Sequence, residues 1–331
     1  MKLLKIATIV ISSFLGLALF AFVVAAVYFN QAIKETTTND QTQNIIEVKD
    51  GESTLGVAKR LKERGLISSD AFFAILAKIK KGSIYAGVYR IPREASILSV
   101  YDQLSSGKVT HIKVTIPEGW RTEQIAQVLS KKNLVSYEEF ITKAKPFEGK
   151  LFPDTYFFPY DTTAENIISQ MQDDFTKRTS GLNVSDADIV IASIVEREAV
   201  TDEERPLIAG VFKNRIAKGM RLEADPTIQY SKDSVLIKAM PAAELTDFRF
   251  WQPITISQSP LYDSPYNTYI ALGLPPGPIC NPGLASIKAT VNSQEHNYLY
   301  FLHKDGVIYP SATVEEHNAN RAKILGVKIK R

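Results

Sequence analysis

The sequence predicts an α+β protein in which an N-terminal transmembrane helix precedes a small α+β subdomain and a larger mixed α+β domain. Three observations predict this order. They are an uncharged apolar run near the N-terminus, alternating strand-like and helical segments over residues 45–117, and helical patterns from residue 118 that give way to a Pro- and Gly-rich, aromatic stretch after residue 219. The 331 residues suffice for an anchor and one or two domains with cores of their own.

The apolar run from Ile6 to Phe29 predicts the anchor, because as a helix it spans about 36 Å, slightly more than the hydrocarbon core of a bilayer. Lys2 and Lys5 precede it, so the positive-inside rule predicts cytoplasmic residues 1–5, a span over 6–29 and an extracytoplasmic remainder. A cleaved signal peptide is the alternative, since the letters VAA imitate a cleavage site. The run exceeds the usual apolar core of a signal peptide, which favours the anchor.

Residues 30–44 are polar without apolar periodicity and predict a flexible linker. Residues 45–117 are predicted to form a strand with a turn at Asp50-Gly51, two helices, and then a strand, a helix and a strand. The second helix runs from Ser69 to Lys80 and places Phe72, Ile75 and Leu76 on one face. The pattern "dGeSt…vAkrLkerGLI" loosely resembles the LysM fold, a small glycan-binding module. A LysM-like subdomain over 45–117 is therefore expected before a catalytic domain over 118–331.

Charge and motif content exclude several classes of protein. The formal net charge of +3, without a long basic run, argues against nucleic-acid binding. The single cysteine, Cys280, permits no intramolecular disulfide. We expect neither a metal site nor a cofactor, because the four histidines lack metal-ligand spacing and the Walker A, GxGxxG and GxSxG motifs are missing from the sequence.

The segment DADIVIASIVEREA predicts a helix over 186–199 with Ser185 or Asp186 as its N-cap. Every residue from Ile189 to Val195 is apolar or small, so the helix is expected to be buried nearly all round. Glu196 and Glu198 lie at its C-terminal end. A carboxyl group in such surroundings is desolvated, which favours a protonated acid, but spacing does not choose between the two glutamates, and both could simply solvate the helix end.

Two further segments offer residues for a saccharide cleft. In GMRLEADPTIQY, Pro226 favours an extended Asp225, and SPYNTYIALGLPPGPICNPG predicts a rigid loop with rings and amides. Aromatic rings stack on sugar faces and amides bond sugar hydroxyls, although aromatic residues more often serve packing. The residues predicted to line the cleft are Asp225, Gln229, Tyr230, Tyr266, Asn267, Tyr269 and Asn281.

The chain resembles the endolytic murein transglycosylases (MltG, YceG-like). The resemblance rests on five segments in the same order: FEGKLFPDTY with the preceding IPEGW, SIVEREA, NRI-KGMRLEADPTIQY, SPYNTYIALGLPPGPICNPG and YLYFLHKDGVIYPSATVEEHNAN. It covers essentially everything after residue 45. The resemblance implies a bacterial cell-membrane enzyme that acts on peptidoglycan glycan strands, possessing no cofactor, with membrane-bound peptidoglycan synthases (penicillin-binding proteins) as partners.

The resemblance also implies the reaction, a lytic cleavage of the β-1,4 bond between N-acetylmuramic acid and N-acetylglucosamine that leaves a 1,6-anhydro end. The family's catalytic glutamate, the first of the SIVE-x-E motif, falls on Glu196, which is predicted to act as the single general acid/base. Two alternatives remain. One is a muramidase that uses Glu196 with a second carboxylate such as Asp225. The other is a non-catalytic glycan-binding scaffold of the wall-synthesis machinery.

Overall fold

The computed structural model describes residues 2–38, 45–92, 94–255, 257, 260 and 262–326. The chain divides into two compact units: unit 1 comprises residues 1–111 and 159–161, and unit 2 comprises residues 112–158 and 162–331. The mixed α+β class that the sequence predicts is confirmed. The predicted domain boundary after residue 117 and the LysM-like assignment stay predictions.

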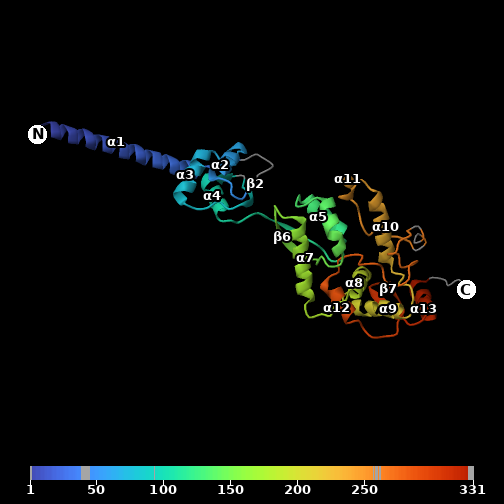
Figure 1. Ribbon diagram of the computed structural model, residues 1–331. Coiled ribbons are helices and arrows are strands. Elements are labelled where there is room, and N and C mark those ends of the chain that lie inside the picture. Colours follow the sequence, from blue (N-terminus) through green and yellow to red (C-terminus); the bar gives the residue numbers. More distant parts are fainter. Residues whose placement is uncertain are drawn as a thin grey trace. The chain divides into compact units, whose positions relative to one another are not determined.

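The secondary structure follows the chain as shown in Figure 1. In unit 1 the elements are α1 (Lys2–Ala32), β1 (Thr36–Thr38), β2 (Ile45–Val48), α2 (Thr54–Glu63), α3 (Asp70–Lys80), β3 (Gly87–Arg90), β4 (Glu94–Ser96) and α4 (Ile97–Ser105). From the end of unit 1 through unit 2 they are β5 (His111–Thr115), α5 (Thr122–Lys131), α6 (Tyr137–Ala144), β6 (Thr155–Pro159), α7 (Ala164–Thr179), α8 (Asp186–Glu198), α9 (Arg205–Ala217), α10 (Asp225–Ala239), α11 (Ala242–Leu245), α12 (Leu284–Val291), β7 (Tyr300–Lys304), β8 (Val307–Ser311) and α13 (Val314–Leu325).

Unit 1 joins the apolar helix α1 to a small α+β core. Within α1, the residues Ser13–Ala32 form a helix long and apolar enough to cross a membrane, which agrees with the predicted anchor. Two antiparallel pairs, β1 with β4 and β2 with β3, lie beside α2, α3 and α4. Their core contains buried side chains from every one of these helices, among them Leu61, Phe73 and Leu104.

Part of the stretch predicted to be a flexible linker is ordered. Helix α1 continues to Ala32, Ile33 is buried in the core of unit 1, and Leu98 donates a backbone hydrogen bond of 2.9 Å to the Ile33 carbonyl. The threonines of β1 then pair with β4, since β-branched residues suit a pleated, half-buried surface. The rest of the predicted linker, residues 39–44, lies outside the described residues.

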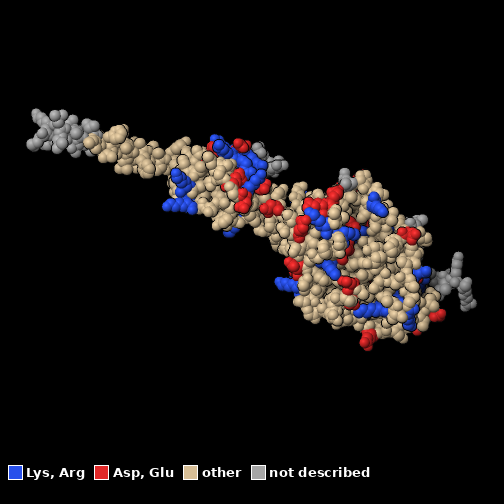
Figure 2. All heavy atoms as spheres, in the orientation of Figure 1, with Lys and Arg blue, Asp and Glu red and all other residues tan. Residues whose placement is uncertain are grey.

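Unit 2 contains two apolar clusters, and its charged side chains of both signs are interspersed over the face drawn in Figure 2. The first cluster joins α5, α6 and α7 to the paired strands β5 and β6. The second surrounds α8 and α9 and includes Ile279 and Cys280 of the loop before α12. Helix α8 packs against α9, α10 and α12, so it crosses the centre of this second cluster.

Helix α10 corrects two expectations for the segment after residue 219. That segment was expected to hold few helices and an extended Asp225, yet a helix of 15 residues begins at Asp225. The extended residue is the N-cap Ala224, with φ −95° and ψ 120°, while Pro226 lies in the first turn. The first-turn N–H groups have no partner within a helix, so proline is tolerated there and helps to begin α10.

Candidate active site

Helix α8 carries both glutamates of the SIVEREA segment. As predicted, Ser185 caps its N-terminus, where the side chain accepts a hydrogen bond from the Asp188 N–H, and residues 189–195 are all buried. Glu196 and Glu198 are two positions apart, which corresponds to about 200° of rotation around the helix. The two carboxyl groups therefore point to opposite sides of α8 and belong to different surroundings.

Glu196 faces the loop that precedes α12. Its Oε2 accepts a hydrogen bond of 2.9 Å from the Gly283 N–H, and its Oε1 lies 3.4 Å from Nη1 of Arg205. The side chain is only 7% exposed. Gly283 is the N-cap of α12, whose dipole stabilises a negative charge at that end. The Arg205 guanidinium and the N-terminus of α12 both contact the Glu196 carboxyl group, and these contacts join α8 to α9 and α12.

The IPEGW segment supplies a second carboxyl group beside Gly283. A Cβ at Gly283 would meet the carboxyl group of Glu118, so any larger residue there would displace that side chain. Burial and the nearby charge of Glu196 raise the pKa of Glu118, and Arg205 opposes the shift. Sequence reasoning did not connect Glu118 with Glu196, because 78 positions of chain separate two groups that meet only after folding.

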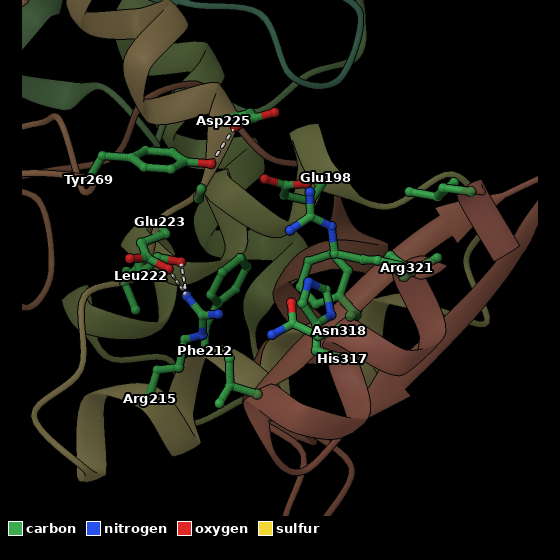
Figure 3. Close-up of a pocket in the computed structure, with 15 residues that line it drawn as sticks. Glu198, Phe212, Arg215, Leu222, Glu223, Asp225, Tyr269, His317, Asn318 and Arg321 are labelled. Carbon is green, nitrogen blue, oxygen red and sulfur yellow. Dashed lines mark hydrogen bonds and ion pairs between the residues drawn. The ribbon is translucent and has the colours of Figure 1, made fainter. Parts of the chain in front are cut away.

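Glu198 lines a cavity of about 580 Å³ on the other side of α8 (Figure 3). Burial, and next the negative charge of Asp225, raise the pKa of Glu198 to about 8, while the Asp225 backbone N–H and Arg215 oppose the shift. Glu198 therefore carries its proton at neutral pH. Of the two glutamates on α8, Glu198 is the one with both a cavity in front of it and a proton to give.

Asp225 and Tyr269 stand beside Glu198 in this cavity. The phenolic Oη of Tyr269 donates a hydrogen bond of 2.6 Å to Oδ1 of Asp225. The loop that carries Tyr269 is attached to the start of α10 by a buried hydroxyl pair, Thr227 to Thr268, at 2.8 Å. Asn267 stabilises the same loop, because its Oδ1 accepts a hydrogen bond from the Tyr269 N–H. The Asp225 carboxyl group is thus held in place close to Glu198.

The opposite wall of the cavity comes from α13, which contributes His317, Asn318 and Arg321. Burial is the main cause that lowers the pKa of His317, so its ring is neutral at physiological pH. Within the described ranges, Nδ1 of His317 is a buried side-chain atom without a hydrogen-bond partner. His317 thus brings a buried polar atom without a partner to the cavity wall, where a ligand could supply one.

Arg215 and Glu223 close one end of the cavity. Arg215 donates to the backbone carbonyls of Leu222 and Leu299 at 2.8 and 2.6 Å and lies 3.3 Å from the Glu223 carboxylate. Glu223 has φ of +48°, a left-handed conformation that costs on the order of 1 kcal/mol in a residue with a side chain. Its N–H donates to the Thr268 carbonyl, so the fold holds this strained residue at the cavity wall.

The other residues predicted to line the cleft lie elsewhere. Tyr230 and Tyr266 pack ring to ring at 4.6 Å and line a second, mostly apolar cavity of about 560 Å³, which also contains Lys145. Gln229 is half-buried on α10 and lines neither cavity. Of the predicted cleft residues, therefore, Asp225 and Tyr269 accompany Glu198, and Asn267 supports them.

Asn281 is fully buried and uses its amide to join three segments. Its Oδ1 accepts from the N–H groups of Gly149 and Leu151 at 2.8 and 3.0 Å. Its Nδ2 donates to the Trp120 carbonyl at 3.0 Å and to Glu148 at 3.3 Å. Because all of these hydrogen bonds are internal, the Asn281 amide stabilises the fold. We therefore do not place Asn281 in the cleft.

Comparison with known proteins supports the family resemblance that the sequence segments indicate. The profile of the YceG-like family matches residues 46–323. The chain belongs to this family. A relative named endolytic murein transglycosylase, from Bacillus subtilis, is 30% identical and is matched over 92% of this chain and 91% of its own length. A relative of the same name from Streptococcus pneumoniae is 27% identical, and the chain spans 62% of its length.

A solved structure also resembles the fold. The crystal structure of a yceG-like protein from Listeria monocytogenes is 28% identical, with a TM-score of 0.52, and the match covers 83% of this chain and 97% of that one.

Several cavity residues of this YceG-like chain escaped sequence reasoning. Arg215, Glu223, His317, Asn318 and Arg321 all line the cavity with Glu198. His317 is one of the four histidines that lack metal-ligand spacing, and its place in the sequence gives no other sign of a role. The one sequence feature that could have pointed to these cavity residues is that NRI, RLEADP and EEHNAN all occur in the segments that carry the family resemblance. Their order along the chain does not reveal that they converge on one cavity.

Glu196→Gln is expected to destabilise unit 2 by about 2 kcal/mol, because it removes the buried carboxylate that pairs with Arg205 and accepts from the Gly283 N–H. In a unit of this size the melting temperature should fall by about 5 °C. Differential scanning calorimetry of the full chain in detergent measures the shift. Glu203→Gln is the matched control, since Glu203 is exposed just before α9. Equal melting temperatures for the two variants would exclude a stabilising role for Glu196.

Proposed function

We propose that this protein is a membrane-anchored lytic transglycosylase that cleaves peptidoglycan glycan strands internally, with Glu198 as its general acid and base. The observation that carries the proposal is the carboxyl group of Glu198 at the wall of a 580 Å³ cavity, where burial and the charge of Asp225 raise its pKa to about 8. The substrate class is supported by the names of the relatives, which are endolytic murein transglycosylases. Glu196 stays the assignment that the sequence resemblance implies, and the variants below separate the two glutamates.

The bond we propose to be cut is the β-1,4 linkage between N-acetylmuramic acid and N-acetylglucosamine. Glu198 gives its proton to the leaving glycosidic oxygen as the bond from the anomeric carbon breaks. The C6 hydroxyl of the same muramic residue then bonds to the anomeric carbon and returns its proton to Glu198. No water is consumed, the enzyme regains its starting state, and the product carries a 1,6-anhydro end.

One carboxyl group suffices for this sequence of steps, since the acid of the first half is the base of the second. Burial is the main cause that raises the pKa of Glu198, and the negative charge of Asp225 raises it further. Asp225 also stabilises positive charge that develops on the sugar ring. Tyr269 positions Asp225 through its 2.6 Å hydrogen bond.

The proposed setting is the outer side of a bacterial cell membrane. Support comes from α1, whose residues Ser13–Ala32 are apolar enough to span a bilayer. Lys2 and Lys5 at the start of the chain favour a cytoplasmic N-terminus. Membrane-bound peptidoglycan synthases, as makers of the strands to be cut, stay a predicted class of partner.

Product analysis tests the reaction type. The full chain in detergent is incubated with purified peptidoglycan, and the released muropeptides are analysed by mass spectrometry. The proposal predicts anhydro-muropeptides. Reducing ends, which are heavier by one water, would contradict it and favour a muramidase in which Asp225 activates water. Intact strands under all conditions would favour the glycan-binding scaffold.

The rate of cleavage is expected to fall as the pH rises through about 8, because Glu198 must be protonated to act as the acid. Asp225→Asn removes the negative charge that raises the pKa of Glu198, so the alkaline limb of the profile should move to lower pH. The measurement is the pH profile of anhydro-muropeptide release. A limb that stays in place in Asp225→Asn would rule out this origin of the shift.

A further inference from the structure

The face of α3 that carries Phe72 lies against the end of the anchor helix. The Phe72 ring meets Phe29 edge to face, with centroids 5.4 Å apart, and Tyr28 at 6.2 Å. Tyr28 and Phe29 belong to the end of the apolar span Ser13–Ala32, where aromatic residues favour the boundary between acyl chains and headgroups. If α1 spans the bilayer, Phe72 is held at the membrane surface.

The same face of α3 continues with two exposed isoleucines. Ile75 and Ile79 follow Phe72 at offsets of three and seven, which align along one side of a helix. They are 46% and 64% exposed, whereas Phe73 and Leu76 turn into the core of unit 1. Of the three residues predicted to share one face, Leu76 is buried and Ile75 is exposed. The fold of unit 1 leaves an apolar stripe on its surface that begins at the anchor.

Lysines accompany the stripe. Lys78, Lys80 and Lys81 are exposed at the C-terminal end of α3, and Figure 2 shows basic side chains over this region of unit 1 on the side where α1 enters. Lys80 lies 3.9 Å from Asp102. Among the residues that the structure describes, Lys78 and Lys81 have no carboxylate within 4.0 Å. These two positive charges complement the phosphate groups of anionic lipids.

We propose that the α3 face of Phe72, Ile75 and Ile79, with Lys78 and Lys81 beside it, lies on the lipid surface around α1. The isoleucines enter the boundary between headgroups and acyl chains, and the lysine stems extend along it so that the ammonium groups reach lipid phosphates. Continuity with the anchor selects lipid as the occupant, because the residue that touches α1 is part of the stripe. The inference rests on the proposed membrane span but not on the proposed chemistry.

Site-specific fluorescence tests this contact in the full chain, reconstituted in nanodiscs of phosphatidylglycerol and phosphatidylcholine. The sequence has one cysteine, Cys280, which is buried, so a cysteine introduced at the surface can be labelled selectively. An environment-sensitive dye is attached in Ile79→Cys, and nitroxide-labelled lipids serve as quenchers. Leu55→Cys, 50% exposed on α2, is the matched control, and Phe20→Cys inside the span reports insertion of α1.

The proposal predicts that lipid nitroxides quench the dye in Ile79→Cys several-fold more than in Leu55→Cys, and that Phe20→Cys is quenched as well. Quenching at Phe20→Cys with equal, weak quenching at the other two positions would overturn the surface contact and leave the anchor in place. No quenching at Phe20→Cys would remove the membrane span and the contact together. In the Ile79→Cys background, Lys78→Glu with Lys81→Glu should lower quenching in discs that contain phosphatidylglycerol, and unchanged quenching would overturn the role of the lysines.

Discussion

Replacing Glu198 by Gln is expected to lower the rate of glycan cleavage by about two to four orders of magnitude, the usual contribution of a general acid/base. The amide keeps the shape of the side chain but has no proton to give to the leaving oxygen. The variant should fold, because Glu198 is already neutral at pH 7 and its replacement leaves no charge unpaired. The measurement is the initial rate of anhydro-muropeptide release, with the melting temperature as the check on folding.

Glu196→Gln is the matched variant on the same helix. It should keep most of the cleavage rate at temperatures below its own melting transition, because Glu196 faces Arg205 and Gly283 on the side of α8 away from the cavity. The two variants thus lose different properties, Glu198→Gln its rate and Glu196→Gln its stability. Full cleavage by Glu198→Gln together with an inactive, folded Glu196→Gln would return the catalytic role to Glu196.

Asn281→Ala is expected to lower the free energy of unfolding of unit 2 by on the order of 4 kcal/mol, since it leaves the buried N–H groups of Gly149 and Leu151 without an acceptor. It also removes the hydrogen bonds to the Trp120 carbonyl and Glu148. Thermal or chemical unfolding of the full chain measures the loss.

Asn297→Ala provides the control for this prediction, because Asn297 is an exposed asparagine that should tolerate truncation within about 0.5 kcal/mol. A melting temperature of Asn281→Ala equal to that of Asn297→Ala would show that the buried amide is dispensable. If such a stable variant also bound glycan poorly, Asn281 would belong to the cleft, as the sequence predicts.

The local structure of α8 was predictable because its signals are local. A serine followed three positions later by an acidic residue predicts the capping box, and a run of apolar or small residues from Ile189 to Val195 predicts burial on every side. The same pattern does not choose between Glu196 and Glu198. Two positions along a helix always point to opposite sides, and only the neighbours decide which side is a cavity and which a helix N-terminus.

Helix α10 and the α3 stripe show where periodicity misleads. The segment of α10 begins with Asp225-Pro226 and buries residues on several sides, so its pattern lacks the apolar stripe of a surface helix. In α3 the helical spacing groups Phe72, Ile75 and Leu76, but it does not tell which of them enters the core and which contacts α1. Both features depend on tertiary contacts that the local sequence does not contain.

The protonation state of Glu198 is the central claim, and infrared difference spectroscopy measures it directly. Spectra of the full chain are recorded across a pH series, and those of Glu198→Gln are subtracted to isolate one carboxyl group from others with raised pKa, such as Glu118. We expect a protonated-carboxyl band that is present at pH 7 and disappears with a midpoint near pH 8. A difference spectrum without this band at pH 7 would contradict the account, because Glu198 would then have no proton to deliver.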